Sequence, residues 1–294
     1  MTFSTTRETM GYFTRLAREV GYWNFVIRYS LRKLHKLLKV EQRIRLFNSV
    51  EMILPWYSKF GTEVYLKDKK LDWGSEELLV QFLERDKSFL DVGANIGYYS
   101  LLAAPLSQSV YSFEPDPRIL PELDKNLAQF QNTQVVKEAL YSEPGEMTLS
   151  LHASPELNSL VRQDADGTGI TIPVSTLDQF VAEQSSAQGS VQVSAIKTDA
   201  EGADFEILVG GKDLLVRDQP LVLSEAYPDQ QLLAFAKSIG FTVFAYAKPK
   251  DTSKSHLPPT FMKVEQPPSH VRLKMIFLVP ERLKSQFESK VTVG

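Results

Sequence analysis

The feature that most constrains the fold of this chain is a regular alternation of strand-like and helix-like segments that starts near residue 88. Amphipathic stretches predict helices near residues 96–105, 117–130, 203–216 and 228–239. The expected strands are Ser88–Val92, Val110–Phe113, Gln134–Ala139, Val193–Thr198, Leu221–Glu225, Phe241–Ala247 and Val271–Val279. Strands that alternate with helices form a mostly parallel α/β sheet whose two faces are covered by the helices.

The last two expected strands differ from the others because no helix separates them. A polar, Pro-rich stretch, residues 248–270, joins them instead. Strands joined without a crossover helix are more easily antiparallel than parallel, so we expect an antiparallel last strand. Methyltransferase domains usually have such a strand, and dinucleotide-binding domains usually lack it. Two further strand-like runs, 147–152 and 170–175, predict an insertion at 140–175 that forms an edge hairpin or a lid.

The first 50 residues form a separate basic module. They contain ten Lys or Arg and three Asp or Glu, a net charge of +7, so the other 244 residues carry −10 of the total of −3. We expect helix almost throughout, with one apolar stripe formed by Trp23, Ile27, Leu31, Leu34 and Leu38. The favoured interpretation is that this stripe packs on the protein and the charged face is solvated. The alternative is a basic amphipathic helix, residues 23–39, that lies on an anionic membrane.

These observations predict three parts and a location. Residues 1–50 are a basic helical extension or cap, residues 51–87 are a connecting segment with a helix, and residues 88–294 are the main domain. The first residues lack the apolar core of a signal peptide, and no run of about 18 apolar residues is present. We therefore expect a cytoplasmic protein, with peripheral membrane contact as the alternative.

The strongest local motif is FLDVGANIGYYS, residues 89–100. An apolar strand runs into Asp91, the chain turns through Gly93, Ala94 and Asn95, and Gly97 opens a helix. Ligands of open α/β sheets bind at the carboxyl ends of the strands, where this turn lies. Glu114 ends the next strand, and an acidic side chain there can accept hydrogen bonds from both ribose hydroxyls of an adenosine.

The turn favours S-adenosylmethionine over a nicotinamide dinucleotide. A dinucleotide needs the pattern G-x-G-x-x-G against its pyrophosphate, whereas the sequence here is G-A-N-I-G. The carboxylate of Asp91 would repel a pyrophosphate and attract the positively charged end of S-adenosylmethionine. A nicotinamide-dependent oxidoreductase is therefore disfavoured.

Carboxylates also follow the fourth and fifth expected strands. Asp199 and Glu201 end the run IKTDAEG, and Glu225 ends LVLSEAY. Methyl transfer to an alcohol needs alignment and a base, and a carboxylate beside the cofactor can supply that base. Asp199 or Glu201 is the candidate base, and Glu225 is a candidate for binding substrate hydroxyls. The alternative is that Glu201 caps the next helix and Asp199 only anchors the cofactor.

Composition argues against metal, thiol and nucleic-acid chemistry. The chain has no Cys and four His, none of them three or four residues apart, so we expect no bound metal; a divalent ion held by Asp199 and Glu225 is the weaker alternative. His152, in the insertion, is interpreted as a surface residue. The tetrapeptide that amino-group methyltransferases use is absent at 199–202, which reads DAEG, and the acidic body would repel a phosphate backbone.

The chain resembles the FkbM family of S-adenosylmethionine-dependent methyltransferases in FLDVGANIGYYS, YSFEPDP, STLDQF and IKTDAEGADFEILVGG. The resemblance covers about residues 60–247. It implies a class I methyltransferase, Rossmann-like, with a seven-stranded sheet, and methylation of hydroxyl oxygens on sugars, glycolipids or secondary metabolites. It further implies that the cofactor lies against Asp91, Gly93, Ala94, Asn95, Gly97, Glu114, Pro115, Glu138 and Ala139. A non-catalytic scaffold tethered to a membrane or partner by residues 1–50 is the alternative function.

Overall fold

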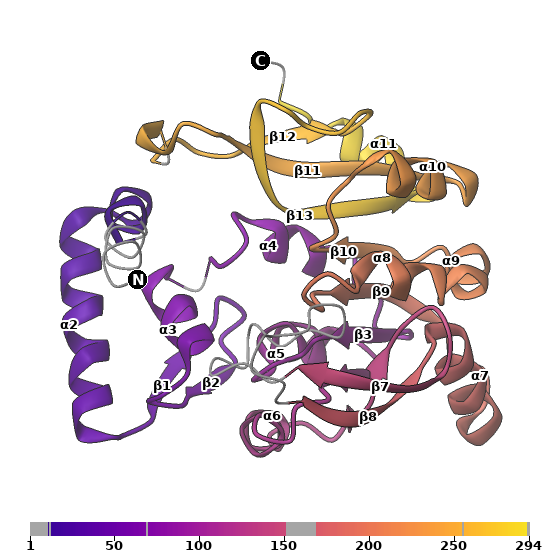
Figure 1. Ribbon diagram of the computed structural model, residues 1–294, viewed down its shortest axis with the longest axis horizontal. Helices are drawn as coiled ribbons and strands as arrows, with labels where there is room; N and C mark the ends of the chain where they lie inside the picture. Colours follow the sequence, from indigo (N-terminus) through magenta and orange to yellow (C-terminus); the bar gives the residue numbers. More distant parts are fainter. Residues whose placement is uncertain (1–10, 12, 69, 151–168, 255, 293–294) are drawn as a thin grey trace.

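A computed structural model of the protein describes residues 11, 13–68, 70–150, 169–254 and 256–292. Its centre is an eight-stranded sheet with the order β12-β11-β13-β10-β9-β3-β4-β5. Figure 1 shows these strands stacked from β12 at the top of the view through β11, β13, β10 and β9 to β3. In chain order the strands are β3 Ser88–Val92, β4 Val110–Phe113, β5 Thr133–Val136, β9 Val193–Thr198, β10 Leu221–Ser224, β11 Phe241–Pro249, β12 Thr260–Lys263 and β13 Val271–Pro280.

The directions of the strands agree with the sequence-based expectation. Strands β5, β4, β3, β9 and β10 pair in parallel, and β13 is antiparallel to both β10 and β11. The expected number of seven strands is wrong, because β12 pairs with β11 as an eighth. This strand has only four residues and lies in the Pro-rich stretch 248–270, so no periodicity marks it.

Helices cover both faces of the sheet. One face packs against α4 Ser75–Val80, α5 Tyr98–Ala103, α6 Leu120–Leu127 and α11 Glu281–Glu288. The other packs against α7 Leu177–Gln188, α8 Asp204–Val209, α9 Lys212–Asp218 and α10 Gln230–Ser238. The helix expected over 203–216 is divided, because the chain passes close to Tyr141 at Gly210. Short 3₁₀ turns lie at Ala104–Leu106 and Thr252–Lys254.

The insertion forms a second, three-stranded sheet. Its order is β6-β8-β7, from β6 Ala139–Leu140, β7 Gly145–Ser150 and β8 Gly169–Ser175. The single strand expected over 134–139 is therefore wrong: β5 ends at Val136, and Ala139 belongs to the second sheet. His152 and the rest of residues 151–168 lie outside the described residues.

The N-terminal part is helical only up to Leu38. Residues 13–20 are helical, α2 spans Tyr22–Leu38, and an antiparallel pair follows, β1 Gln42–Arg45 with β2 Glu51–Leu54. The expectation of helix almost throughout 1–50 is wrong here, because buried and exposed side chains alternate along β1 with the period of a strand. The helix α3 Lys59–Leu66 follows, and Asn126 of α6 accepts a hydrogen bond from the backbone N–H of Ile53 at 2.7 Å.

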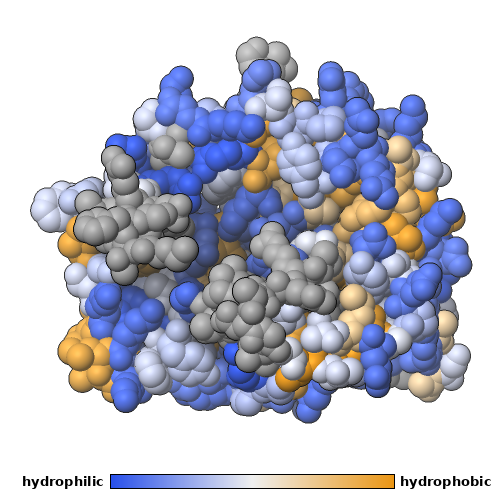
Figure 2. Space-filling model, in the orientation of Figure 1, coloured by the Kyte–Doolittle hydropathy of each residue, from blue (hydrophilic) through white to orange (hydrophobic). Residues whose placement is uncertain are grey.

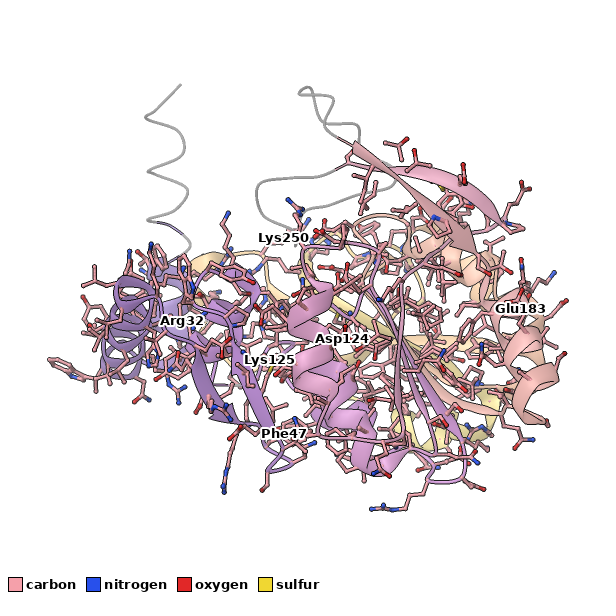
Figure 3. All side chains as sticks on the ribbon, turned by 90° about the horizontal axis from the view of Figure 1, so that it is seen from below. Arg32, Phe47, Asp124, Lys125, Glu183 and Lys250 are labelled. Carbon is pink, nitrogen blue, oxygen red and sulfur yellow. The ribbon has the colours of Figure 1, made fainter. Side chains whose placement is uncertain are left out.

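The basic face of α2 packs on the protein, and its apolar stripe faces outward. Arg32 is 1% exposed, lies on the inner side of α2 in Figure 3, and donates to the carbonyl oxygen of Pro55 at 2.5 Å. Phe25 and Tyr29, which point toward the same half of the helix, stack on each other, and Phe13 contacts both rings in tilted and edge-on orientations. The favoured interpretation, in which the apolar stripe packs inward, is therefore wrong.

The exposed fractions of the stripe are large. They are 77% for Trp23, 57% for Ile27, 44% for Leu31, 49% for Leu34 and 61% for Leu38. Figure 2 shows hydrophobic residues along the edge of the molecule that α2 forms. Within the described residues, no helix has the combination of length and hydropathy needed to cross a membrane.

Candidate active site

A cavity of about 740 Å³ opens at the carboxyl ends of the parallel strands. Its size is within the range of small-molecule and cofactor sites. The sequence-predicted residues that line it are Gly93, Ala94, Asn95, Glu114, Pro115, Glu138, Ala139, Asp199, Glu201 and Glu225. Asp91 and Gly97 do not line it. The sheet therefore brings ten of the twelve candidate residues to one cavity.

The turn between β3 and α5 forms one wall of the cavity because of its backbone geometry. Gly93 has φ 72° and Asn95 has φ 49°, both in the left-handed region. A Cβ atom at Gly93 would lie 2.0 Å from the carbonyl oxygen of Asp199. The turn after β3 and the turn after β9 are therefore in direct backbone contact, and only glycine fits between them.

Glu114 lies at the end of β4 beside this turn. One of its carboxyl oxygens accepts a hydrogen bond from the N–H of Asn95 at 2.9 Å, and the other accepts one from the N–H of Asp116 at 2.9 Å. Burial outweighs these hydrogen bonds and raises the pKa of Glu114 to about 7. Each oxygen retains a second lone pair that can accept a hydrogen bond from a ligand hydroxyl.

Asp91 lies behind the cavity wall, where it holds two elements in place. Its Oδ2 accepts hydrogen bonds from the backbone N–H and the hydroxyl of Ser100 at 2.9 and 2.6 Å, which fixes the start of α5. Its Oδ1 lies 3.6 Å from the Nζ of Lys197. Gly97, with φ 89°, precedes α5 and packs against Leu123.

Lys197 connects Asp91 with the cavity. Its Nζ lies 3.6 Å from Asp199 and donates to the carbonyl oxygen of Gly93 at 2.8 Å. Burial alone would lower the pKa of Lys197, but Asp199 and Asp91 outweigh burial and raise it. Lys197 is therefore a fixed positive charge between the two turns that form the cavity wall.

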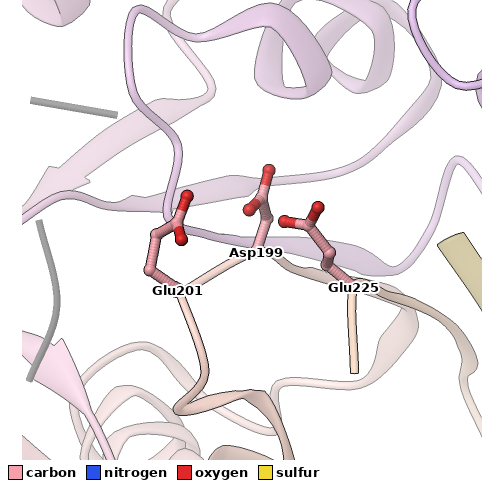
Figure 4. A group of neighbouring side chains, drawn as sticks. All are labelled: Asp199, Glu201 and Glu225. Atoms are coloured by element: carbon pink, nitrogen blue, oxygen red, sulfur yellow. The ribbon is translucent and has the colours of Figure 1, made fainter. Parts of the chain in front are cut away.

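Asp199, Glu201 and Glu225 form a carboxylate cluster at the edge of the cavity. One carboxyl oxygen from each lies within 4.8 Å of the others, and Figure 4 shows the three groups pointing into the same space. Glu201 has φ 46°, a backbone conformation that is unfavourable for a residue with a side chain and is concentrated at functional sites. Carboxylates at this spacing can recognise hydroxyl groups, move a proton or hold a divalent ion.

The members of the cluster differ in protonation. Asp199 and Glu225 share a hydrogen bond between their carboxyl groups. Burial alone would raise the pKa of Asp199, but Lys197 and the hydrogen bond from Glu225 lower it. Partial burial and then the negative charge of Asp199 raise the pKa of Glu225. Asp199 is therefore ionised at neutral pH, and Glu225 carries the proton of the pair.

The sequence interpretation missed a second group of polar residues in the same cavity, which comes from the segment before β3 and from β13. Lys274 Nζ lies 2.5 Å from Asp72 and donates to the carbonyl oxygen of Leu71 at 2.8 Å. The hydroxyl of Tyr99 donates to Asp72 at 2.5 Å, and Glu63 lies 3.9 Å from Lys274. A lysine in the middle of the apolar strand VRLKMIFLV was the available signal.

Similarity to known proteins agrees with this geometry. Residues 91–246, more than half of the chain, match the family described as "Methyltransferase FkbM domain". The chain is 26% identical over 177 residues to the 2-O-methyltransferase NoeI of Sinorhizobium fredii, which covers 52% of this chain and 69% of NoeI.

Two solved structures are also similar. A methyltransferase FkbM from Methylobacillus flagellatus KT is 13% identical, with a TM-score of 0.42, over 74% of this chain and 52% of that one. An rRNA methylase from Streptococcus thermophilus is 16% identical, with a TM-score of 0.41, over 70% of this chain and 95% of that one. The sheet order, the antiparallel β13 and the family match identify a class I methyltransferase fold. The chain belongs to the FkbM family of methyltransferases, and its cofactor is S-adenosylmethionine.

Proposed function

We propose that this protein transfers the methyl group of S-adenosylmethionine to a hydroxyl oxygen of a carbohydrate, a glycolipid or a secondary metabolite. The observation that carries the proposal is the cluster of Asp199, Glu201 and Glu225, which opens into the same cavity as the cofactor-binding turn. An alcohol must lose its proton as it accepts a methyl group, and a carboxylate at hydrogen-bond distance can accept that proton.

The residues present fit S-adenosylmethionine. Glu114 can accept hydrogen bonds from the two ribose hydroxyls, and Glu138 and Ala139, which line the same cavity, would flank the adenine. The ionised Asp199 provides a negative charge for the amino group of the methionine moiety. When bound, the cofactor supplies an electrophilic methyl group on a sulfonium sulfur.

The protein's own residues would then perform three tasks. Lys197 holds Asp199 ionised and aligned, which fixes the cofactor. Glu225, which carries a proton, orients the acceptor hydroxyl by a hydrogen bond. Glu201, the third carboxylate, accepts the proton of the acceptor. This arrangement requires no metal ion, because proton transfer and alignment are supplied by side chains.

Two alternatives are less well supported. A non-catalytic scaffold would have no reason to keep Glu114, Asp199 and Glu201 around one cavity. A nucleic-acid substrate is disfavoured because the body of the chain beyond residue 50 is acidic and would repel a phosphate backbone. Failure to bind S-adenosylhomocysteine at millimolar concentration would favour the scaffold.

We expect the affinity for S-adenosylhomocysteine to rise about tenfold between pH 6 and pH 8. The pKa of Glu114 is about 7 in the free protein, so the carboxyl is mostly protonated at pH 6 and ionised at pH 8. The ionised form accepts hydrogen bonds from the ribose hydroxyls more strongly, so ligand binding below pH 7 must release a proton. Calorimetric titration across this pH range measures the effect.

Glu114→Gln should bind S-adenosylhomocysteine weakly, with an affinity that does not change between pH 6 and pH 8. Glu183→Gln is the control, because Glu183 lies on α7, at the opposite end of the molecule from Arg32 in Figure 3, and does not line the cavity; this variant should leave both affinity and pH dependence unchanged. Wild-type affinity in Glu114→Gln would remove Glu114 from the cofactor site.

We also propose peripheral membrane contact through residues 23–39, made by the apolar stripe of α2 rather than by its basic face. A contiguous exposed apolar surface of this kind marks an interaction site. The sequence of α2 contains no Asp or Glu, and Lys33 and Lys39 are exposed beside the stripe, which favours an anionic lipid surface. A second copy of the chain is a less favourable partner for the stripe, because it would bring these like-charged lysines together at the contact.

The double variant Trp23→Ser, Leu34→Ser should bind vesicles of phosphatidylglycerol and phosphatidylcholine at least tenfold more weakly than the wild type, because two apolar side chains no longer enter the bilayer. Co-sedimentation measures this. Val216→Ser removes an equally exposed apolar residue, 52% exposed on α9, and should have no effect. Unchanged vesicle binding in the double variant, or a dimer that only the double variant loses, would contradict the membrane proposal.

A further inference from the structure

A second cavity, of about 440 Å³, lies beside the first and has no role in the proposed function. It is lined by residues of the helical stretch 15–19, by Lys67 and Trp73, by Lys250 and Pro268 from the loop before β13, and by the start of β13. Glu63 and Lys274 line both cavities. A molecule in the second cavity would therefore lie next to the carboxylate cluster of the first, separated from it by this pair.

The lining of the second cavity has an excess of positive charge. Five cationic side chains line it, namely Arg15, Lys67, Lys250, Arg272 and Lys274, against two carboxylates, Glu19 and Glu63. Both carboxylates are already paired: Glu63 lies 2.5 Å from Lys67, and Glu19 lies 3.3 Å from Lys248, which is outside the lining. The excess of cations is unusual in a chain whose net charge is −3.

Two pairs of cations in this cavity lie close enough to repel each other. Burial and then the neighbouring Arg15 lower the pKa of Arg272. Burial and then Lys274 lower the pKa of Lys67, although Glu63 acts in the opposite direction. Like charges held together in this way destabilise each other, and a bound anion would relieve the repulsion.

Arg272 also has an unused donor. Its Nε donates to the carbonyl oxygen of Pro249 at 3.1 Å, and its guanidinium lies 5.8 Å from the ring centre of Trp73. Its Nη2 is buried and has no hydrogen-bond partner among the described residues. A buried donor without a partner is costly, and a guanidinium nitrogen is well suited to an oxyanion.

We propose that this second cavity binds a phosphate-like oxyanion carried by the acceptor, while the acceptor hydroxyl lies at the carboxylate cluster of the first cavity. The binding of the oxyanion stands on Arg272, Arg15 and the shape of the cavity; its assignment to the acceptor rests on the proposed function. Arg272 and Arg15 would contact the anion, and Lys274, shared by both cavities, would lie between the anion and the reacting hydroxyl.

Calorimetric titration of pyrophosphate into the full chain, saturated with S-adenosylhomocysteine, tests the site. We expect saturable binding of pyrophosphate. Arg272→Gln should lower the affinity at least tenfold, and Arg15→Gln should also lower it. The control is Arg43→Gln, which removes an exposed guanidinium on β1 that pairs with Glu51 of β2 at 2.6 Å. This variant should bind pyrophosphate like the wild type. Unchanged affinity for S-adenosylhomocysteine in Arg272→Gln shows that the variant is folded.

Two results would overturn the site: equal pyrophosphate affinity in the wild type and Arg272→Gln, or displacement of S-adenosylhomocysteine by pyrophosphate, which would place the anion in the first cavity. The proposed function fails separately, if the wild type binds pyrophosphate through Arg272 but does not bind S-adenosylhomocysteine.

A second measurement tests whether the acceptor carries the anion. Pyrophosphate should inhibit methyl transfer from labelled S-adenosylmethionine into an extract of the source cells, in competition with the extract and not with the cofactor. Binding that depends on Arg272 without such inhibition would contradict the assignment to the acceptor.

Discussion

Gly93→Ala should abolish binding of S-adenosylhomocysteine and destabilise the protein by about 3 kcal/mol or more. The new Cβ atom would lie 2.0 Å from the carbonyl oxygen of Asp199 and 2.9 Å from its carbonyl carbon. Both atoms belong to the backbone, so no side-chain rotation relieves the overlap. The turns after β3 and β9 must separate, and these turns carry Asn95 and Asp199 into the cavity. Urea unfolding and calorimetric titration measure the two effects.

Gly240→Ala is the matched control for backbone strain. Gly240 has φ 80°, close to the 72° of Gly93, but a Cβ atom there would meet nothing within 4 Å. The Gly240→Ala substitution should lower the free energy of unfolding by about 1 kcal/mol, from the unfavourable φ alone, and leave ligand binding unchanged. A Gly93→Ala protein that matches Gly240→Ala in stability and still binds the ligand would show that the two turns can move apart without loss of the site.

The cofactor end of the cavity could be predicted from the sequence because its determinants are local. The run from Asp91 to Gly97 contains a strand end, a tight turn and a helix start, and Glu114 follows at the end of the next strand. Parallel strands place such residues at one edge of the sheet whatever the rest of the fold does. It was not predictable that Gly93 lines the cavity while Asp91 lies behind its wall. The position of Asp91 depends on its pairing with Lys197 and Ser100.

Features that depend on contacts between distant segments were not predictable. Helical periodicity located the apolar stripe of α2 correctly, but periodicity alone cannot say which face meets the protein. The buried position of Arg32 depends on acceptors at Gln42, Pro55 and Thr62 from the following segments. Lys274 likewise joins the site only because β13 brings it to Asp72, about 200 residues away in sequence.

Glu201→Gln should lower kcat for methyl transfer by about 10²- to 10³-fold, within the usual range for loss of a general base, with little change in cofactor affinity. The amide cannot accept the acceptor's proton. Asp199 is less suited to that task, because Lys197 and Glu225 lower its pKa and so weaken it as a base. Transfer of labelled methyl groups into an extract of the source cells gives the rate, and calorimetry with S-adenosylhomocysteine gives the affinity.

The variant Glu225→Gln distinguishes the role of Glu225 from that of Glu201, the proposed base. Because protonated Glu225 donates a hydrogen bond to Asp199, the amide of Gln can donate in the same place, so we expect kcat to fall by less than about fivefold. If Glu225→Gln lowered kcat as much as Glu201→Gln, Glu225 would have to lose its proton during turnover, and Glu201 would not be the unique base. If both Glu201→Gln and Glu225→Gln kept full turnover, the base would have to be Asp199, the remaining carboxylate of the cluster, and the pH optimum should then extend into the acid range, because a carboxyl of lowered pKa stays ionised there.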